Sequence, residues 1–307
     1  MGIAPRNTEM APLKPGVYTA LVTPFTADGT SVDWDSYARL IALQIAGGVA
    51  GVVACGTTGE SPTLSQSDAR RAISVAVELC RGTGVLVLAG TGSNDTSEAV
   101  AATAWARDAG ADAALVVNPY YNRPSQAGLL AHVRAILAGA PGLPLLLYNI
   151  PGRSGVNMGV DTIAALAAEP RVVGVKDATG SVDAATEIAA RALPGFLVFS
   201  GDDGLTLPYM SIGAVGVVSV VSNLWPKRVV RMVDAALRND FSAARAAHAA
   251  LWPVFKGAFI ETNPVPIKTA LAAAGVISHA AVRLPLVALE AANAAKWASV
   301  AGALKDE

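Results

Sequence analysis

The stretch Arg171-Val-Val-Gly-Val-Lys-Asp-Ala-Thr-Gly180 is an apolar, β-branched run with a lysine near its end. Such a run is typical of a strand that is buried on both faces of a parallel sheet. Because side chains alternate along a strand, Lys176 shares a face with Val172 and Gly174. Burial favours the neutral amine, which is a nucleophile toward carbonyl carbons. The stretch therefore predicts either a Schiff-base lysine or a strand-end lysine that reaches solvent or Asp177.

Similar apolar runs recur along the chain, and alanine-rich segments with helical spacing separate them. The eight runs are Val17–Phe25, Gly51–Gly56, Val85–Gly92, Ala113–Pro119, Pro144–Ile150, Val172–Ala178, Phe196–Asp203 and Gly216–Ser222. The first four helical segments are Trp34–Gly47, Ser65–Cys80, Thr96–Gly110 and Ser125–Leu137. Ser65-Gln-Ser-Asp68 resembles a capping box, and Gly47-Gly48 is well placed to stop a helix.

Strands that alternate with helices indicate βαβ units and a parallel sheet, and eight such units predict a (β/α)8 TIM barrel. An open doubly wound sheet is the alternative. It is disfavoured because no strand is followed by G-x-G-x-x-G; the nearest match, Gly90-Thr-Gly92-Ser-Asn-Asp95, lacks the third glycine.

The chain of 307 residues is expected to form one barrel with two flanking parts. We predict a flexible N-terminal extension over residues 1–16, the barrel over 17–240 and a C-terminal helical appendage over 241–307. The appendage would contain the helical segments Phe241–Thr262, Pro266–Ala274 and Leu286–Leu304.

Composition argues for a cytoplasmic enzyme without a nucleic-acid or membrane partner. The formal net charge is −1, which does not suit an anionic surface. No uninterrupted apolar span reaches the roughly 18 residues that a membrane helix needs, and residues 1–16 lack the apolar core of a signal peptide. The two cysteines, Cys55 and Cys80, do not suggest a disulfide framework.

In a barrel of this kind, functional groups gather where the strands end. The second run leads into Cys55-Gly-Thr-Thr-Gly-Glu-Ser61, which could bind a small anion or form an ordinary strand-to-helix turn. The fourth ends in Asn118-Pro-Tyr-Tyr-Asn-Arg-Pro124, and adjacent tyrosines are commonly used for interface packing. In the fifth, Tyr148 would lie beside Lys176, and Arg153 in the following loop could clamp a carboxylate or remain an exposed loop arginine.

A metal site is disfavoured. The histidines, His132, His248 and His279, fall in helical or C-terminal segments, and paired cysteines are absent. Ser200-Gly-Asp-Asp203 alone could be taken for a metal site. The remaining lysine, tyrosines, threonines and arginine suit a carbonyl substrate that bears carboxylates, because lysine forms an imine and tyrosine moves protons.

Several motifs together resemble the dihydrodipicolinate synthase family, whose superfamily includes N-acetylneuraminate lyase. They are Cys55-Gly-Thr-Thr-Gly-Glu-Ser-Pro-Thr-Leu64, Pro119-Tyr-Tyr-Asn-Arg-Pro-Ser125, Tyr148-Asn-Ile-Pro-Gly-Arg-Ser-Gly155, Val173-Gly-Val-Lys-Asp-Ala-Thr-Gly180, Ser200-Gly-Asp-Asp203, Gly216-Val-Val-Ser-Val220 and Asn263-Pro-Val-Pro-Ile-Lys268. The resemblance implies condensation of pyruvate with L-aspartate-4-semialdehyde in lysine and diaminopimelate biosynthesis, with a covalent lysine–pyruvate imine and no other cofactor.

The resemblance also implies a role for each matching residue. Lys176 would form the imine, and a proton relay would consist of Tyr148, Thr58 and Tyr121, the last lent by a neighbouring subunit. Arg153 would hold the semialdehyde carboxylate. The pyruvate site would be formed by Thr57, Thr58, Gly201 and Val218.

Assembly and regulation are implied in the same way. The family is usually a homotetramer of two tight dimers, and some members bind lysine as an effector near the dimer interface. Four residues fit that effector site: Ser61, Asn94, Glu98 and Tyr120. Gln66 and Ala69, however, stand where strongly sensitive members tend to carry histidines, so we expect weak or absent feedback inhibition.

Two other functions compete with the synthase. A sister lyase or dehydratase would act on a sialic acid or a 2-keto-3-deoxy sugar acid through the same imine, and Gly-Thr-Thr-Gly-Glu with Arg153 favours the synthase over it. A non-enzymatic keto-acid-binding protein would not need Lys176 together with its tyrosine and threonine partners.

Overall fold

The computed structural model describes residues 13–191 and 194–304, so most of the predicted extension over 1–16 lies outside the described residues. Its strands are hydrogen-bonded in chain order and close into a barrel, β1 to β8. They are β1 (Gly16–Ala20), β2 (Gly51–Ala54), β3 (Leu86–Gly90), β4 (Ala113–Val117), β5 (Leu145–Asn149), β6 (Val172–Asp177), β7 (Leu197–Ser200) and β8 (Gly216–Ser219). The predicted TIM barrel is confirmed. The predicted domain boundaries remain predictions. The chain divides into two compact units, one built on residues 88–217 and the other on 16–87 and 218–304.

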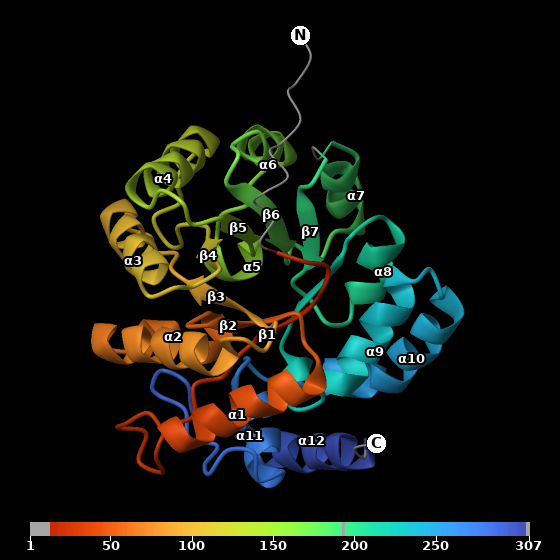
Figure 1. Cartoon of the computed structure of the whole chain (residues 1–307). Helices are drawn as coiled ribbons and strands as arrows, with labels where there is room; N and C mark the ends of the chain where they lie inside the picture. Colours follow the sequence, from red (N-terminus) through yellow and green to blue (C-terminus); the bar gives the residue numbers. More distant parts are fainter. Residues whose placement is uncertain (1–12, 192–193, 305–307) are drawn as a thin grey trace. The chain divides into compact units, whose positions relative to one another are not determined.

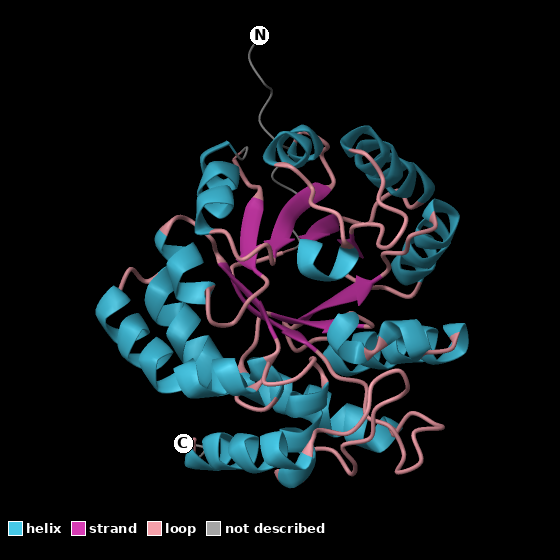
Figure 2. Ribbon diagram, turned by 180° about the vertical axis from the view of Figure 1, so that it is seen from behind, coloured by secondary structure: helices cyan, strands magenta, loops and turns pink. Residues whose placement is uncertain are grey.

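The unit built on residues 88–217 alternates strand and helix (Figures 1 and 2). Its helices are α3 (Thr96–Asp108), α4 (Gln126–Gly139), α5 (Pro151–Ser154), α6 (Val160–Ala167), α7 (Val182–Arg191) and α8 (Thr206–Ser211). Strands β4 to β7 pair in parallel, and α3, α4, α6 and α7 lie outside them in Figure 1. This arrangement brings the ends of β5, β6 and β7 side by side.

Strands β5 and β6 are buried along their whole length, which explains the apolar residues at 145–147 and 172–175. Gly174 is the one residue of these two strands that has no side chain. A Cβ at this position would collide with the Leu197 carbonyl of β7, so only glycine lets β6 and β7 approach so closely.

The other unit contains the first and last parts of the chain. Its helices are α1 (Trp34–Gly47), α2 (Gln66–Cys80), α9 (Pro226–Leu237), α10 (Phe241–Gly257), α11 (Val265–Ala273) and α12 (Ala291–Ala303), with short 3-10 turns η2 (Thr57–Gly59), η3 (Ser61–Thr63) and η4 (Val221–Asn223). Helix α9 packs against α10, and α12 packs against α10 and α11.

The last helix is shorter than the sequence predicts. A helix from Leu286 is wrong, because α12 begins only at Ala291. At its start, the side chain of Glu261 accepts hydrogen bonds from the Glu290 N–H at 3.0 Å and from Asn293 Nδ2 at 2.8 Å. A carboxylate from another segment therefore supports this helix start, and local sequence does not reveal it.

Candidate active site

Lys176 and Tyr148 lie directly opposite each other on neighbouring strands. The register of β5 and β6 pairs them, and their side chains are only 6% and 5% exposed. Lys176 Nζ lies 3.9 Å from the centroid of the Tyr148 ring. The buried amine thus faces the ring of Tyr148, the residue that the sequence predicted to lie beside it.

Asp177, the alternative partner of Lys176, is engaged elsewhere. Its Oδ1 accepts hydrogen bonds from the Thr179 N–H at 3.0 Å, the Thr179 hydroxyl at 2.7 Å and the Tyr209 hydroxyl at 3.0 Å. Burial is the main cause that raises the pKa of Tyr209, with Asp177 adding to it, so Tyr209 stays a neutral donor. The carboxylate therefore fixes the end of β6, on the strand face opposite Lys176.

Gly201 follows β7 and lies next to the lysine side chain. A Cβ there would approach Lys176 Cε to 3.1 Å and Ala178 Cβ to 2.6 Å. Because real Cβ atoms rarely tolerate such contacts, glycine preserves the space around the amine.

Arg153 and Tyr121 lie in the segments that follow β5 and β4 of the same unit. Arg153 lies exposed in the short helix α5. Tyr121 is 90% exposed and has a left-handed backbone with φ 74°, and its N–H donates to the Ser154 carbonyl at 3.2 Å. A non-glycine residue in this conformation costs about 1–3 kcal/mol and persists only where its surroundings hold it. The hydrogen bond therefore ties the Tyr121 loop to the end of α5.

The remaining predicted site residues belong to the other unit. Thr57 and Thr58 form η2, and Val218 is buried in β8. Thr58 is buried, and its hydroxyl oxygen accepts a hydrogen bond from Asn263 Nδ2 at 2.9 Å. Val218 presents only an apolar side chain, so any polar contact from this position would come from its backbone.

Sequence reasoning missed three residues around the Thr57–Thr58 turn as site residues: Asn263, Glu60 and Lys268. Glu60 and Lys268 form a buried ion pair with Oε1 and Nζ 2.7 Å apart. Burial lowers the pKa of Lys268 to about 8, although Glu60 opposes the shift. The motifs Gly-Thr-Thr-Gly-Glu and Asn-Pro-Val-Pro-Ile-Lys were visible, but nothing in the sequence indicated that they touch.

The candidate effector residues lie in different elements, Ser61 in η3 and Glu98 in α3 among them, and their role remains a prediction. Asn94 accepts a hydrogen bond on its carbonyl from Asn122 Nδ2 at 2.9 Å, and Glu98 accepts one from the Ser93 hydroxyl at 2.9 Å. Ser61 begins η3, and Tyr120 is partly exposed beside Tyr121.

Residues that could suggest a metal have local partners instead. Asp202 Oδ1 accepts hydrogen bonds from the backbone N–H groups of Gly204 and Leu205 at 2.8 and 3.2 Å, so Ser200-Gly-Asp-Asp203 forms a turn. His132 Nδ1 lies 2.9 Å from the Thr96 hydroxyl, and His248 lies against the rings of Trp252 and Phe255. Within residues 13–191 and 194–304, no three or more histidine, cysteine, aspartate or glutamate side chains gather as a possible metal site. No helix in that part of the chain has the length and apolar character needed to cross a membrane.

The model of the dihydrodipicolinate synthetase family matches residues 14–304. The chain belongs to this family. The 4-hydroxy-tetrahydrodipicolinate synthase of Leptospira biflexa is 46% identical over 293 residues, which cover 95% of this chain and 98% of the relative. The predicted family and its synthase activity are thus confirmed.

Solved structures of family members superpose on the chain closely. Dihydrodipicolinate synthase from Aquifex aeolicus has a TM-score of 0.91 at 43% identity and covers 94% of this chain and 98% of its own. The chloride-inhibited enzyme from Acinetobacter baumannii, complexed with pyruvate, has a TM-score of 0.90 at 39% identity and covers 94% and 99%.

Proposed function

We propose that the chain condenses pyruvate with L-aspartate-4-semialdehyde through an imine on Lys176. The observation that carries the proposal is the Lys176 amine, buried over the Tyr148 ring, with Gly201 keeping space beside it. The pyruvate complex of the Acinetobacter baumannii relative supports pyruvate as one substrate.

The chemistry follows from the nucleophilic amine. Lys176 attacks the carbonyl carbon of pyruvate, and loss of water gives a protonated imine. The imine withdraws electrons, so the methyl carbon loses a proton and becomes an enamine carbon that attacks the aldehyde carbon of the semialdehyde. The aldehyde oxygen takes up a proton. The amino group of the semialdehyde then displaces the lysine nitrogen, which closes the ring of 4-hydroxy-tetrahydrodipicolinate and regenerates Lys176.

The surrounding residues are assigned roles from the family resemblance and their chemistry. Tyr148, Thr58 and Tyr121 would relay the protons. Thr57, Thr58, Gly201 and Val218 would bind pyruvate. Arg153 would hold the semialdehyde carboxylate, for which a planar guanidinium with two parallel donors is well suited.

A homotetramer of two tight dimers is part of the proposal, and so is a cytoplasmic location. The exposure of the Tyr121 ring supports the assembly, because a relay tyrosine that projects from its own chain is placed to act in a partner subunit.

Borohydride trapping tests the imine directly. With pyruvate present, reduction is expected to add one pyruvyl group to the peptide that contains Lys176, and none to the Lys176→Ala variant. Lys268 is an internal control, because it is also buried but bound to Glu60. A label on Lys268 or on any other lysine in place of Lys176 would refute the assignment.

Turnover assays separate the synthase from its sister enzymes. Pyruvate with aspartate semialdehyde should give product, whereas pyruvate with N-acetylmannosamine should not. Product from N-acetylmannosamine and none from aspartate semialdehyde would instead indicate a sialic acid lyase.

A further inference from the structure

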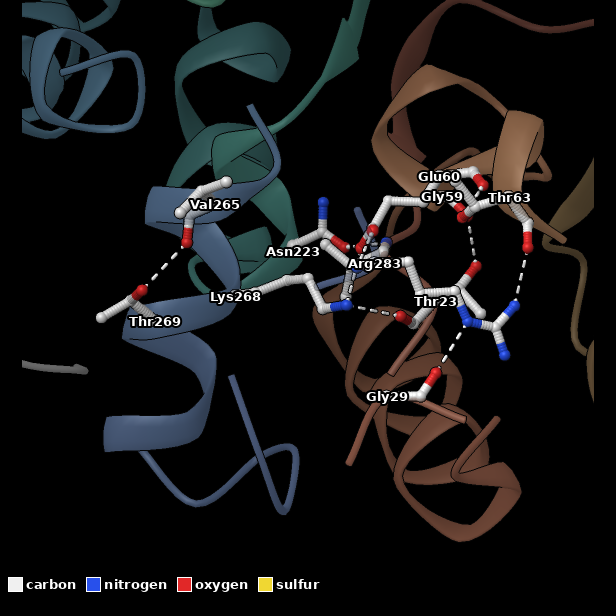
Figure 3. Close-up of polar contacts among 11 residues, drawn as sticks. Thr23, Gly29, Gly59, Glu60, Thr63, Asn223, Val265, Lys268, Thr269 and Arg283 are labelled. Carbon is white, nitrogen blue, oxygen red and sulfur yellow. Dashed lines mark hydrogen bonds and ion pairs between the residues drawn. The ribbon is translucent and has the colours of Figure 1, made fainter. Parts of the chain in front are cut away.

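The turn that carries Thr57 and Thr58 ends at a buried carboxylate. Glu60 directly follows η2, has a left-handed backbone with φ 53° and is buried. Its Oε1 accepts a hydrogen bond from Lys268 Nζ at 2.7 Å (Figure 3). The same nitrogen donates to the Thr23 carbonyl at 2.9 Å. Lys268 on α11 thus connects the end of the turn to the segment that follows β1.

Arg283 holds the other side of the same carboxylate. Its backbone N–H donates to Glu60 Oε2 at 2.9 Å, and its guanidinium Nη1 donates to the Thr63 carbonyl at 2.8 Å. Both cations also lie against the Phe25 ring, whose centroid is 4.1 Å from Lys268 Nζ and 4.2 Å from Arg283 Cζ. Both carboxylate oxygens therefore have donors, and Lys268 pairs with the buried negative charge.

The segment Asn263–Lys268 contacts the turn at two places. At one end Asn263 Nδ2 donates to the Thr58 hydroxyl oxygen at 2.9 Å, and at the other Lys268 binds Glu60. Because the amide occupies an acceptor site of this hydroxyl, the hydroxyl hydrogen remains available for a different acceptor. The amide therefore orients the hydroxyl of Thr58.

The segment after β1 holds the middle of the turn. The Thr23 hydroxyl donates to the Gly59 carbonyl at 2.7 Å. A Cβ at Gly59 would lie 3.2 Å from both this hydroxyl oxygen and the Leu21 carbonyl, so the turn is seated tightly. Consecutive residues Thr58, Gly59 and Glu60 are thus each held by a side chain from elsewhere in the chain.

The ion pair is an expensive way to stabilise a fold. Removing both charges from water costs several kcal/mol per ion, and well-packed apolar residues often stabilise a protein as well or better. Its benefit lies in geometry, since a charged pair with all donors and acceptors matched permits one arrangement of the turn.

We propose that Glu60 and Lys268, with Asn263, are positioning residues that fix the Thr57–Thr58 turn in its reactive arrangement. The inference rests on the proposed function, in which these threonines bind the pyruvate carboxylate and Thr58 relays a proton. A loss of this support would misplace both groups at once.

The double variant Glu60→Gln with Lys268→Met tests this inference. It removes both charges together, and the glutamine keeps an acceptor for the Arg283 N–H, so no buried charge is left alone. We expect it to unfold at nearly the wild-type temperature. Its kcat should fall about tenfold or more and its KM for pyruvate should rise, because a small displacement of reacting groups is costly.

A control and a second variant make the outcome decisive. Leu271→Ala, on the buried face of α11, should lower the unfolding temperature while kcat and KM stay near wild type. Thr23→Val removes the hydroxyl that holds Gly59 but leaves both charges, and should lower kcat even where the double variant fails to fold. Wild-type kcat and KM in Thr23→Val and in any folded double variant would overturn the inference. A wild-type chain that forms no product would overturn the proposed function, and this inference with it.

Discussion

Lys176 and Lys268 are the buried lysines among the described residues, and their surroundings differ at the level of single atoms. Lys268 Nζ donates to a carboxylate and a carbonyl at 2.7 and 2.9 Å, whereas Lys176 Nζ faces an aromatic ring at 3.9 Å. A charge-assisted hydrogen bond holds an ammonium far more firmly than a tyrosine ring does. Burial alone therefore does not mark the nucleophile. The glycine at position 201, where a Cβ would crowd Lys176 Cε, supports the proposal that Lys176 is the reacting amine.

Replacing Gly201 with alanine should hinder imine formation at Lys176. The added Cβ would lie 2.6 Å from Ala178 Cβ and 3.1 Å from Lys176 Cε, so both neighbours have to move. We expect Gly201→Ala to slow borohydride trapping of pyruvate by about tenfold or more. The rate is measured by mass spectrometry of the intact chain.

The matched control is Gly302→Ala in α12. A Cβ there would meet nothing within 4 Å, and alanine favours a helix more than glycine does. Gly302→Ala should trap pyruvate at the wild-type rate. Trapping that is equally fast in Gly201→Ala would show that the space beside Lys176 is unimportant.

At the scale of elements, the sequence predicted the ends of a helix well where the capping residues directly adjoin that helix. Helix α1 spans Trp34–Gly47 as predicted, because the Asp33 side chain caps its start and Gly48 with φ 74° ends it. Ser65 likewise accepts the Asp68 N–H at the start of α2. The start of α12 was wrong, because a distant carboxylate, Glu261, helps to define it.

The contrast between local and distant contacts also explains why some site residues were predicted and others were missed. Tyr148 and Lys176 could be paired from strand alternation and strand order, which sequence periodicity reveals. The bonds from Asn263 to Thr58 and from Lys268 to Glu60 span 205 and 208 residues. Such contacts depend on where α11 packs in three dimensions, and no local pattern encodes that position.

Helices α3 and α4 meet at a buried histidine that should make stability depend on pH. His132 Nδ1 lies 2.9 Å from the Thr96 hydroxyl, and Nε2 is buried with no hydrogen-bond partner among the described residues. Burial lowers the pKa of His132 below its usual 6.5. The unfolded chain therefore binds the proton more readily, and the free energy of unfolding should fall as pH drops through about 6.5.

Urea unfolding at pH 7.5 and pH 5.5 checks this dependence. His132→Gln, which keeps a polar side chain but does not titrate, should lose less stability over that interval than the wild type. Burial lowers the pKa of His248 in the same direction, so the variant is expected to retain part of the loss. An identical loss in variant and wild type would contradict the role of His132.

At the scale of the whole molecule, contacts within one chain do not account for the conformation and exposure of Tyr121. It adopts a strained backbone and presents a ring that is 90% exposed, although the proposed reaction uses its hydroxyl. Strain held at an exposed aromatic residue is reasonable if a partner subunit receives the ring. The active unit would then be a dimer at least.

Mixing two inactive chains can decide where Tyr121 acts. In a mixed dimer of Lys176→Ala and Tyr121→Phe chains, the second chain keeps its lysine and would receive an intact tyrosine from the first. Random assembly should restore about a quarter of wild-type turnover, because half of the dimers are mixed and each holds one complete site. The co-expressed mixture is assayed with pyruvate and semialdehyde without separating its dimers. If Tyr121 acted within its own chain, neither site of the mixed dimer would be complete, and the mixture would stay as inactive as either variant alone.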